Sequence, residues 1–470
     1  ARKRPKPRGR PRGRRRLDLT TLPFRRVVLD PDEVIAAHGE GFCVIGEEVS
    51  ERLVFLPGTH IRLQIARRKW ARIEPSPAAT LAWTEAPEEA SVPPESPTVQ
   101  IAPVPDNVWP RTMADPSAIA QHLVAKYEDC LPLHRQEKIS ARHGFCVPRG
   151  TQCGWLTEAF TYLHRITDAM FDDAKAHAFC LATDATSAPV RAPGQCVKHH
   201  VFVFVADQRH VVFRHAPAHN GVTVQTWLTG DRGYVLADAA SIDDVVYRTH
   251  PIVEVACWAH LRRYFWRALG SDPQPASEAI AVIGKLFEVQ RACASLPMPE
   301  RTAVRADKAR PLLHLFDRWI ERHRDTADAR GPLRAAITYY DNQRAALHRF
   351  LEDGRLRLDN NLSEAQLRRL VLGRANWTYF ANETGLDWYV TFRSLIASCH
   401  LHGLNPQHYL EQVLRLAPHW PVTRMIELSP HRWKQTLATL SDAQREILKP
   451  PWELDRTVTP RPVQAVDRAA

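Results

Sequence analysis

The sequence predicts an α/β protein whose central sheet is separated from its last helix by a long helical insertion. Between residues 177 and 258, short apolar runs typical of strands surround one helical stretch. Residues 259–357 carry only helical periodicity, and a polar run at 358–377 then opens a further helix. A chain of 470 residues is also too long for one ordinary core, so we expect three to five structural units.

The positive charge is concentrated at the start of the chain. Residues 1–16 contain ten Lys or Arg and no acid, so the net charge of +11 leaves only 11 − 10 = +1 for the rest. The Pro and Gly content predicts a disordered basic tail over 1–23, and such a tail favours nucleic acid as a partner. Arg8 and Arg10 lie in an Arg-Gly-Arg-Pro sequence similar to the core of an AT-hook, so we expect them to contact DNA. Non-specific phosphate binding is the simpler form of that contact, and a solvating tail is the alternative.

Membrane and disulfide chemistry are not indicated. No apolar run reaches the roughly 18 residues that span a bilayer, and no signal-peptide pattern opens the chain. Nine scattered cysteines, an odd number, are typical of reduced thiols. We therefore expect a cytoplasmic protein without a membrane partner.

The first part of the chain predicts a small module and a linker. Residues 24–73 alternate apolar and polar residues, which predicts a β-rich module. It contains His38, Cys43 and His60, but a structural zinc site needs four ligands, so no zinc is predicted. Residues 74–110 are rich in Pro, Ala, Glu and Ser without periodicity, which predicts a linker.

Residues 111–176 predict a helical region. Asp115 and Pro116 form a good helix start, and a second helix over 135–142 ends at Gly144 before a longer one. A helix, a turn and a helix fit a helix-turn-helix DNA reader, although most helix pairs joined by a glycine turn are packing units. We predict a DNA-binding region here.

Residues 177–258 carry the strand pattern. The predicted strands are 179–182, 201–206, 211–214, 234–237 and 252–256. The second and third form a hairpin, helix 222–228 follows the third, and an Asp-rich helix at 241–247 precedes the fifth. This is the element order of an RNase H-like core, which we assign to 177–258 and 358–400. The all-helical insertion is 259–357, and 401–470 is a helical C-terminal module in which Asn405 and Pro406 open a helix.

Three carboxylates are candidates for one site. Asp184 follows the first strand, Asp238 follows the fourth, and Glu364 opens the late helix, so an RNase H-like core would bring them to one edge of the sheet. Such a set can hold two Mg²⁺ or Mn²⁺ ions about 4 Å apart. One ion would activate water or a 3′-hydroxyl, and the other would stabilise the leaving oxygen.

Each carboxylate also has a structural interpretation. An Asp after a strand is often a turn residue, Asp243 and Asp244 compete with Asp238, and Glu364 fits a capping box with Asn361. The case for a metal site depends on all three arriving together. Three arginines follow Glu364 on its helix and are predicted to hold DNA phosphates: Arg368, Arg369 and Arg374.

Four blocks of the chain resemble the IS66 family of transposases from bacterial insertion sequences. They are KYEDCLPLHRQEKISARHGFCV from 126, CWAHLRRYF from 257, DNNLSEAQLRRLVLGRANW from 359 and SLIASCHLHGLNPQHYLEQVL from 394. The resemblance implies a DDE transposase with the triad Asp184, Asp238 and Glu364 and bound Mg²⁺, which cleaves transposon ends and transfers their 3′-hydroxyls to target DNA. It also implies a dimer or larger assembly on double-stranded DNA near the nucleoid, with accessory proteins of the same element.

The second block contains a Cys-x-x-His pair, Cys257 and His260. A lone pair cannot complete a zinc site, and transposases of another family use a similar pair to brace the catalytic strand, so we predict a structural role. Arg262 and Arg263 are expected to face DNA, with a solvated helix face as the alternative.

Some residues depart from the family pattern. Ala185 stands where the family has a second Asp, and Ala239-Ala240 stands where it has Gly-Tyr. The stretch around His38 and Cys43 keeps only a degenerate form of the family's zinc-ribbon-like module. These departures leave a second hypothesis, an inactive or regulatory DNA-binding protein derived from a transposase, and a third, a nuclease without strand transfer.

Overall fold

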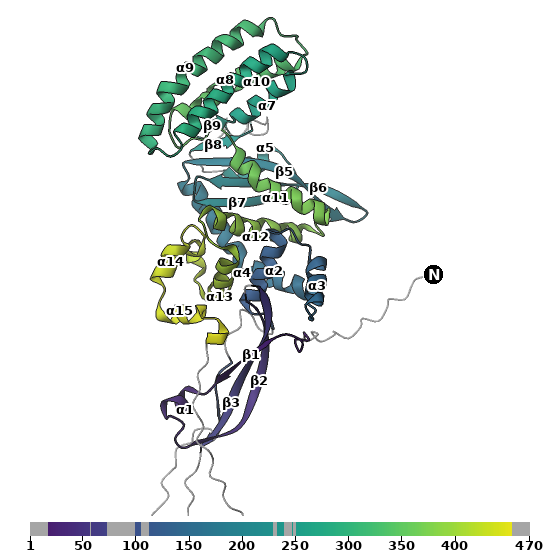
Figure 1. The fold of residues 1–470 in the computed structure, drawn as a ribbon, viewed down its shortest axis with the longest axis vertical. Coiled ribbons are helices and arrows are strands. Elements are labelled where there is room, and N and C mark those ends of the chain that lie inside the picture. Colours follow the sequence, from purple (N-terminus) through teal and green to yellow (C-terminus); the bar gives the residue numbers. More distant parts are fainter. Residues whose placement is uncertain are drawn as a thin grey trace, which may run out of the picture.

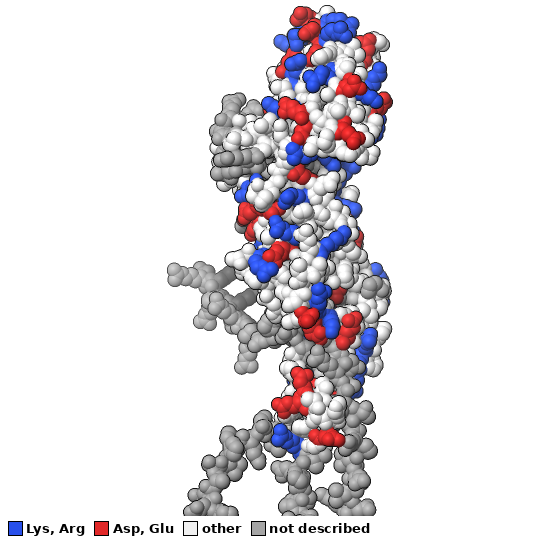
Figure 2. Space-filling view, turned by 90° about the vertical axis from the view of Figure 1, so that its left-hand side faces the viewer, with Lys and Arg blue, Asp and Glu red and all other residues white. Residues whose placement is uncertain are grey.

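The computed structural model describes residues 17–453 except 57, 73–98, 105–111, 229–232, 239–246 and 248–250. Arg8, Arg10, most of the predicted linker, Asp243 and Asp244 therefore lie outside the described residues. The molecule is elongated, with a β-hairpin arm at one end, the central sheet in the middle and the helical insertion at the other end (Figure 1). On the face in Figure 2, Lys and Arg are interspersed with Asp and Glu.

The arm is a four-stranded sheet. Its strands are β1 (Phe24–Leu29), β2 (Phe42–Leu56), β3 (Thr59–Arg72) and β4 (Val99–Ile101), with the short helix α1 (Asp32–Ala36) after β1. β2 and β3 form a long antiparallel hairpin, and β1 pairs with β3 in parallel. β4 falls inside the predicted linker, where it pairs with residues of β3 that β1 does not reach. Cys43 and His60 lie at opposite ends of the hairpin, so they cannot share a ligand set.

Three helices link the arm to the sheet: α2 (Pro116–Tyr127), α3 (Leu133–Arg142) and α4 (Arg149–His177). Asp115 caps α2 as predicted, since its side chain accepts a hydrogen bond from the Ser117 amide at 3.0 Å. Gly144, with φ of +84°, makes the turn after α3, a conformation that glycine adopts readily. α4 packs against β7 and α12, and Leu163, Ile166 and Met170 of this helix are fully buried.

The central sheet has the strand order β7-β6-β5-β8-β9. Its elements are β5 (Cys180–Ala192), β6 (Gln195–Ala206), β7 (His210–Ala216), α5 (Gly221–Leu228), β8 (Tyr234–Ala237) and β9 (Val253–Ala256). β5, β6 and β7 are antiparallel to one another, whereas β8 and β9 run parallel to β5. The predicted hairpin and α5 are confirmed.

The first strand is longer than predicted. Pairing with β6 continues through Asp184 to Ala192, so Asp184 lies within the strand and not after it. The apolar run that predicted this strand ends at Ala182. Proline is tolerated here because β8 does not pair with this part of β5, and the Phe380 segment that bridges this edge donates to the Pro189 carbonyl at 2.9 Å and so needs no N–H from Pro189.

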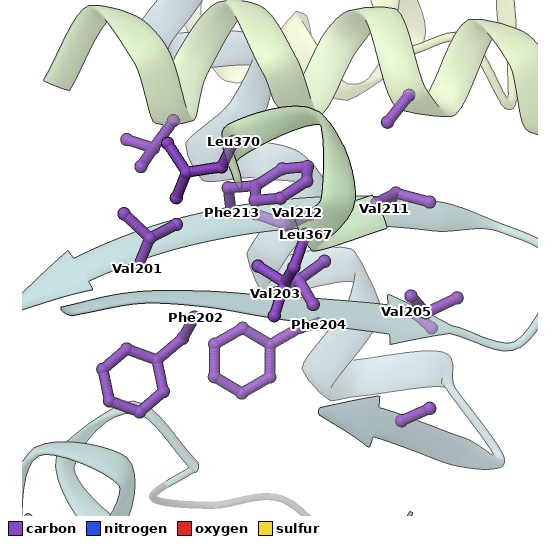
Figure 3. Packing of buried hydrophobic residues seen from close by; sticks show 14 of the residues in the cluster. Val201, Phe202, Val203, Phe204, Val205, Val211, Val212, Phe213, Leu367 and Leu370 are labelled. Carbon is purple, nitrogen blue, oxygen red and sulfur yellow. The ribbon is translucent and has the colours of Figure 1, made fainter. Parts of the chain in front are cut away.

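Helices α11 (Asn361–Trp377) and α12 (Glu383–Leu401) cover one face of the sheet. Val203 points toward Leu367 of α11, whereas Phe202 and Phe204 point to the opposite face (Figure 3). α12 lies along β7, where the hydroxyls of Ser398 and Ser394 accept from the amides of Val211 and Phe213 at 2.9 and 2.8 Å. These hydroxyls satisfy donors that an edge strand otherwise leaves open.

The insertion consists of α7 (Trp258–Ala268), α8 (Pro273–Ala292), α9 (Met298–Arg324) and α10 (Pro332–His348). α9 continues through Pro311, although proline lacks a backbone N–H donor and usually kinks or ends a helix. The described chain ends with α13 (Pro406–Leu416), α14 (Trp433–Thr439) and α15 (Asp442–Leu448). Asn405 caps α13 as predicted. Within the described residues, no helix combines the length and apolar character needed to cross a membrane.

Candidate active site

Two aspartates lie just beyond the pairing of β5 with β8. Ala182 pairs with Leu236, and Asp184 and Asp238 each lie two residues further along the same parallel register. Asp184 also pairs across the sheet with Val203, which points toward α11, so the Asp184 side chain is on the α11 face. The hydroxyl of Tyr339, from α10, donates to the Asp238 carbonyl at 3.2 Å.

Glu364 reaches this edge from the first turn of α11. Asn360 fixes the start of the helix, because its side-chain amide donates to the Thr183 carbonyl at 2.7 Å, next to Asp184. The Oε1 atom of Glu364 is buried and lies 3.6 Å from both His260 Nε2 and Arg263 Nη2. The predicted capping box is wrong: Asn360 is the N-cap residue, and no side-chain hydrogen bond caps this helix.

The carboxylates share one electrostatic environment. Burial raises the pKa of Asp184 to about 6, and the charges of Asp238 and Glu364 add to this effect. The Ala185 amide, which donates to Asp184 Oδ1 at 2.8 Å, and Arg263 oppose it. A divalent cation would relieve the repulsion among these acids, which together with burial raises the pKa of Asp184.

The donor chemistry fits Mg²⁺ or Mn²⁺, since carboxylate oxygens are the ligands these ions prefer. The side chains do not converge on one point, because among the described residues no group of three or more His, Cys, Asp or Glu is placed to hold a metal ion. Glu364 is turned toward His260 and Arg263. Joint metal binding with Asp184 therefore requires the Glu364 carboxylate to rotate.

Cys257 and His260 have different surroundings. The Cys257 sulfur accepts a hydrogen bond from the Asn360 amide at 3.2 Å, and the next residue, Trp258, donates to the Leu358 carbonyl at 3.0 Å. Burial raises the pKa of Cys257 to about 11, so the thiol is protonated at neutral pH. His260 contacts Glu364 instead, and burial lowers its pKa, so this contact is not an ion pair at pH 7.

We expect replacement of Cys257 by Ala to loosen the start of α11. The substitution removes the sulfur that accepts from Asn360 and leaves a small cavity, which together cost about 1–3 kcal/mol of unfolding free energy. Urea unfolding measures this change. Cys196→Ala is the matched control, because Cys196 is exposed and should change stability by less than about 0.5 kcal/mol. Equal effects of the two substitutions would contradict the bracing role.

The predicted DNA-binding arginines differ in their contacts. Arg374 donates to the carbonyl and hydroxyl of Ser187 in β5, the latter at 3.1 Å. Arg369 lies 3.3 Å from Glu128, which also binds Arg393. These two guanidiniums thus help to hold α11 in place. Arg368 and Arg369 are both exposed.

Sequence reasoning missed two residues at this site, Asn360 and Tyr339. Asn360 lies inside the Asp-Asn-Asn sequence before α11, a motif that could have marked it as a site residue. Its partner, Thr183, is distant in the chain and could not be inferred from the local sequence. Tyr339 lies in the insertion, and nothing in its local pattern distinguishes it from a packing residue of α10.

The sheet, the carboxylates and the insertion that divides them belong to a transposase, as comparison with known sequences shows. Residues 111–387 match the family described as "Transposase IS66 family", and residues 394–431 match "IS66 C-terminal element". The chain belongs to the IS66 transposase family. This confirms the resemblance seen in the four sequence blocks.

Three similar proteins come from Sinorhizobium fredii (strain NBRC 101917 / NGR234), and each is described as an uncharacterized protein. Protein y4hP is 28% identical over 446 residues, which cover 88% of this chain and 76% of y4hP. Protein y4qI is 28% identical over 67% of this chain and 62% of its own length. Protein y4jD is 24% identical over 72% of this chain and 69% of its own length.

Proposed function

We propose that the protein is a DDE transposase in which Asp184, Asp238 and Glu364 form the catalytic triad. The observation that carries the proposal is that three carboxylates from distant parts of the chain lie close enough for their charges to interact. Asp184 and Asp238 each lie two residues beyond the last pair of β5 with β8, and burial, together with the charges of Asp238 and Glu364, raises the pKa of Asp184. Carboxylates that repel one another cost stability, so a binding function is the better explanation of the cluster.

The arrangement of the core supports an RNase H-like fold. Three antiparallel strands are followed by two strands parallel to the first, and α11 returns to the edge where the aspartates lie. The helical insertion separates β9 from α11 in the sequence, but the residue two after β9 and the segment before α11 stay together, because the Trp258 amide donates to the Leu358 carbonyl at 3.0 Å. The insertion therefore lengthens the chain between the second and third acids but leaves the edge intact.

The three carboxylates would hold two Mg²⁺ or Mn²⁺ ions. Bound ions supply an activated water or 3′-hydroxyl and stabilise the leaving oxygen during in-line attack on phosphorus. The protein's own groups position the carboxylates: the Ala185 amide orients the Asp184 carboxylate, and Asn360 positions α11. Arg263 offsets the negative charge of Glu364 when no metal ion is bound. Phosphates of double-stranded DNA at the transposon ends and target would be held by exposed arginines such as Arg262 and Arg368 and by Arg8 and Arg10.

A cleavage assay tests this function. DNA carrying the ends of the element that encodes the protein is incubated with the full chain, with Mg²⁺ or with EDTA. We expect nicks at the ends with Mg²⁺ and none with EDTA, because the carboxylates alone cannot activate water. Binding without cleavage under all metal conditions would contradict catalysis and favour the regulatory, DNA-binding alternative.

Strand transfer separates a transposase from a simple nuclease. Pre-cleaved ends with a free 3′-hydroxyl are offered together with a supercoiled target plasmid, and joined products are expected with Mg²⁺ or Mn²⁺. Cleavage without any joined product would instead identify a nuclease.

A further inference from the structure

A pocket of about 540 Å³ opens between α7 and α8, close to Glu364. Its wall includes Asn361, the first residue of α11, and Glu364 follows one turn later on the same helix. Arg263 lines the pocket and also lies 3.6 Å from Glu364. The pocket therefore borders the carboxylate site at Arg263 and Asn361. The other residues that carry the argument are Arg262, Trp266, Gly284, Phe287 and Arg291.

Trp266 is the unusual residue of this pocket, because its side chain is 62% exposed. The insertion buries its other tryptophans: Trp258 and Trp319 are both in the core. Helical periodicity explains why Trp266 faces outward, since Leu261, Phe265 and Ala268 form the buried face of α7. An exposed indole beside a pocket offers a flat apolar surface on which a planar ligand can stack.

The charge of the pocket favours an anion. Arg262, Arg263 and Arg291 contribute three positive charges and Glu288 one negative charge, which leaves 3 − 1 = +2. Arg262 and Arg291 are exposed, and in the described part of the chain neither forms a salt bridge within 4.0 Å. Guanidinium groups bind phosphate oxygens through paired N–H donors, so these side chains suit a phosphodiester.

An indole and several arginines around one pocket match the two parts of a nucleotide. The base would stack on Trp266, and the flanking phosphates would lie against Arg262 and Arg291. A base inside a duplex has both faces covered by its neighbours, so only an unpaired base can stack in this way. The volume is in the range of pockets that hold small ligands.

We propose that the α7–α8 pocket binds one unpaired nucleotide of the DNA substrate, beside the phosphodiester that the carboxylates act on. The proposal rests on the proposed function for its choice of DNA as the ligand. It adds a site outside the carboxylates and assigns the insertion a direct part in substrate binding. Single-stranded DNA at the junction with a duplex is the form of substrate it requires.

The test uses the full chain in EDTA, so that binding is measured without cleavage. The probes are a fluorescein-labelled 20-base-pair duplex and the same duplex with a 3′ overhang of six thymidines, compared by fluorescence anisotropy. We expect the wild type to bind the overhang probe roughly tenfold more tightly, as stacking of one base provides. Trp266→Ala should remove this preference and leave blunt-duplex binding unchanged, whereas Trp266→Phe, which keeps an aromatic ring, should retain most of it.

A second variant fills the pocket without removing any contact. A Cβ added at Gly284 meets no atom within 4 Å, so Gly284→Leu fits the fold and projects into the pocket. It should abolish the overhang preference as Trp266→Ala does. Arg310→Ala, which removes an exposed charge of the same insertion outside the pocket, is the matched control and should keep the preference.

The outcomes are distinct. Overhang preference that persists in both Trp266→Ala and Gly284→Leu overturns the nucleotide site, and so does a wild type that binds the two probes equally. Loss of preference in both variants supports it. Failure of the proposed function appears elsewhere, as absence of Mg²⁺-dependent cleavage by a wild type that still prefers the overhang.

Discussion

Asp184→Asn is expected to abolish cleavage while making the metal-free protein more stable. The substitution removes one of the three proposed metal-binding carboxylates, and loss of such a ligand reduces cleavage by roughly 10²–10⁴-fold. The same carboxylate is buried next to Asp238 and Glu364, which disfavour its charge. Asn is nearly isosteric and neutral, so it relieves this repulsion. Loss of activity together with a gain of stability distinguishes a functional acid from a structural one.

The effect on stability depends on pH in a defined direction. The pKa of Asp184 is about 6 in the folded protein against 3.8 for an ordinary Asp. Between these values the folded state binds more protons than the unfolded chain, so the free energy of unfolding falls as pH rises from about 4 to 6. Asp184→Asn does not lose stability in this way, because Asn carries no charge. Its free energy of unfolding should exceed that of the wild type by about 1–3 kcal/mol at pH 7.5 in EDTA, and the difference should disappear near pH 4.

Urea unfolding at both pH values, alongside the cleavage assay, measures these changes. Mg²⁺ should stabilise the wild type more than Asp184→Asn, because only the wild type has the complete ligand set. Asp307→Asn is the control, since Asp307 is an exposed acid of α9 and should alter neither quantity. Normal cleavage by Asp184→Asn would refute its place in the triad.

Arg305→Ala should strongly destabilise the helical insertion. Arg305 has a relative exposure of 0%, and its guanidinium donates to the carbonyls of Phe350, Asp353 and Leu356 at 2.8–2.9 Å. It also donates to Gln290 Oε1 at 2.7 Å. Alanine would leave these buried acceptors without a donor and create a cavity, at a cost of about 3–5 kcal/mol.

Chemical denaturation compares this variant with Arg305→Lys and Arg310→Ala. Lysine should rescue little, because its single ammonium cannot reproduce the planar set of donors. Arg310 is exposed on the same helix, and its replacement should cost less than about 0.5 kcal/mol. Residues 350–356 lead directly to the segment that contacts Cys257 and begins α11. Cleavage should therefore fall with stability in Arg305→Ala, and a loss below 1 kcal/mol would contradict the anchoring role.

Local patterns were sufficient for much of the fold. The apolar run before residue 206 identified β6, and the Asp-Pro and Asn-Pro sequences located the starts of α2 and α13, because these signals depend only on neighbouring residues. The three acids could also be selected from their places in the order of elements. The closeness of Asp184 to Asp238, however, follows from the register of β5 and β8, which is a property of the assembled sheet.

The remaining features depend on distant partners. β5 extends past Pro189 because its hydrogen-bonded pairing with β6 continues to Ala192. α9 continues through Pro311 because the rest of the insertion packs around this helix. The side chain of Asn360, the N-cap residue of α11, donates to the distant Thr183 carbonyl and does not cap the helix. The capping box predicted for Asn361 and Glu364 is not formed, since no side-chain hydrogen bond caps α11. Arg369 and Arg374 have protein partners on Glu128 and Ser187 that no spacing rule reveals.

The position of α12 bears on how the chain can be divided. The two family segments end and begin at residues 387 and 394, and both points fall within this one continuous helix. Ser394 and Ser398, which belong to the second segment, seal the edge of β7 in the first. A truncation between the segments would uncover that strand and leave it open to pairing with other copies, which is a route to aggregation. The two family segments therefore form one folding unit.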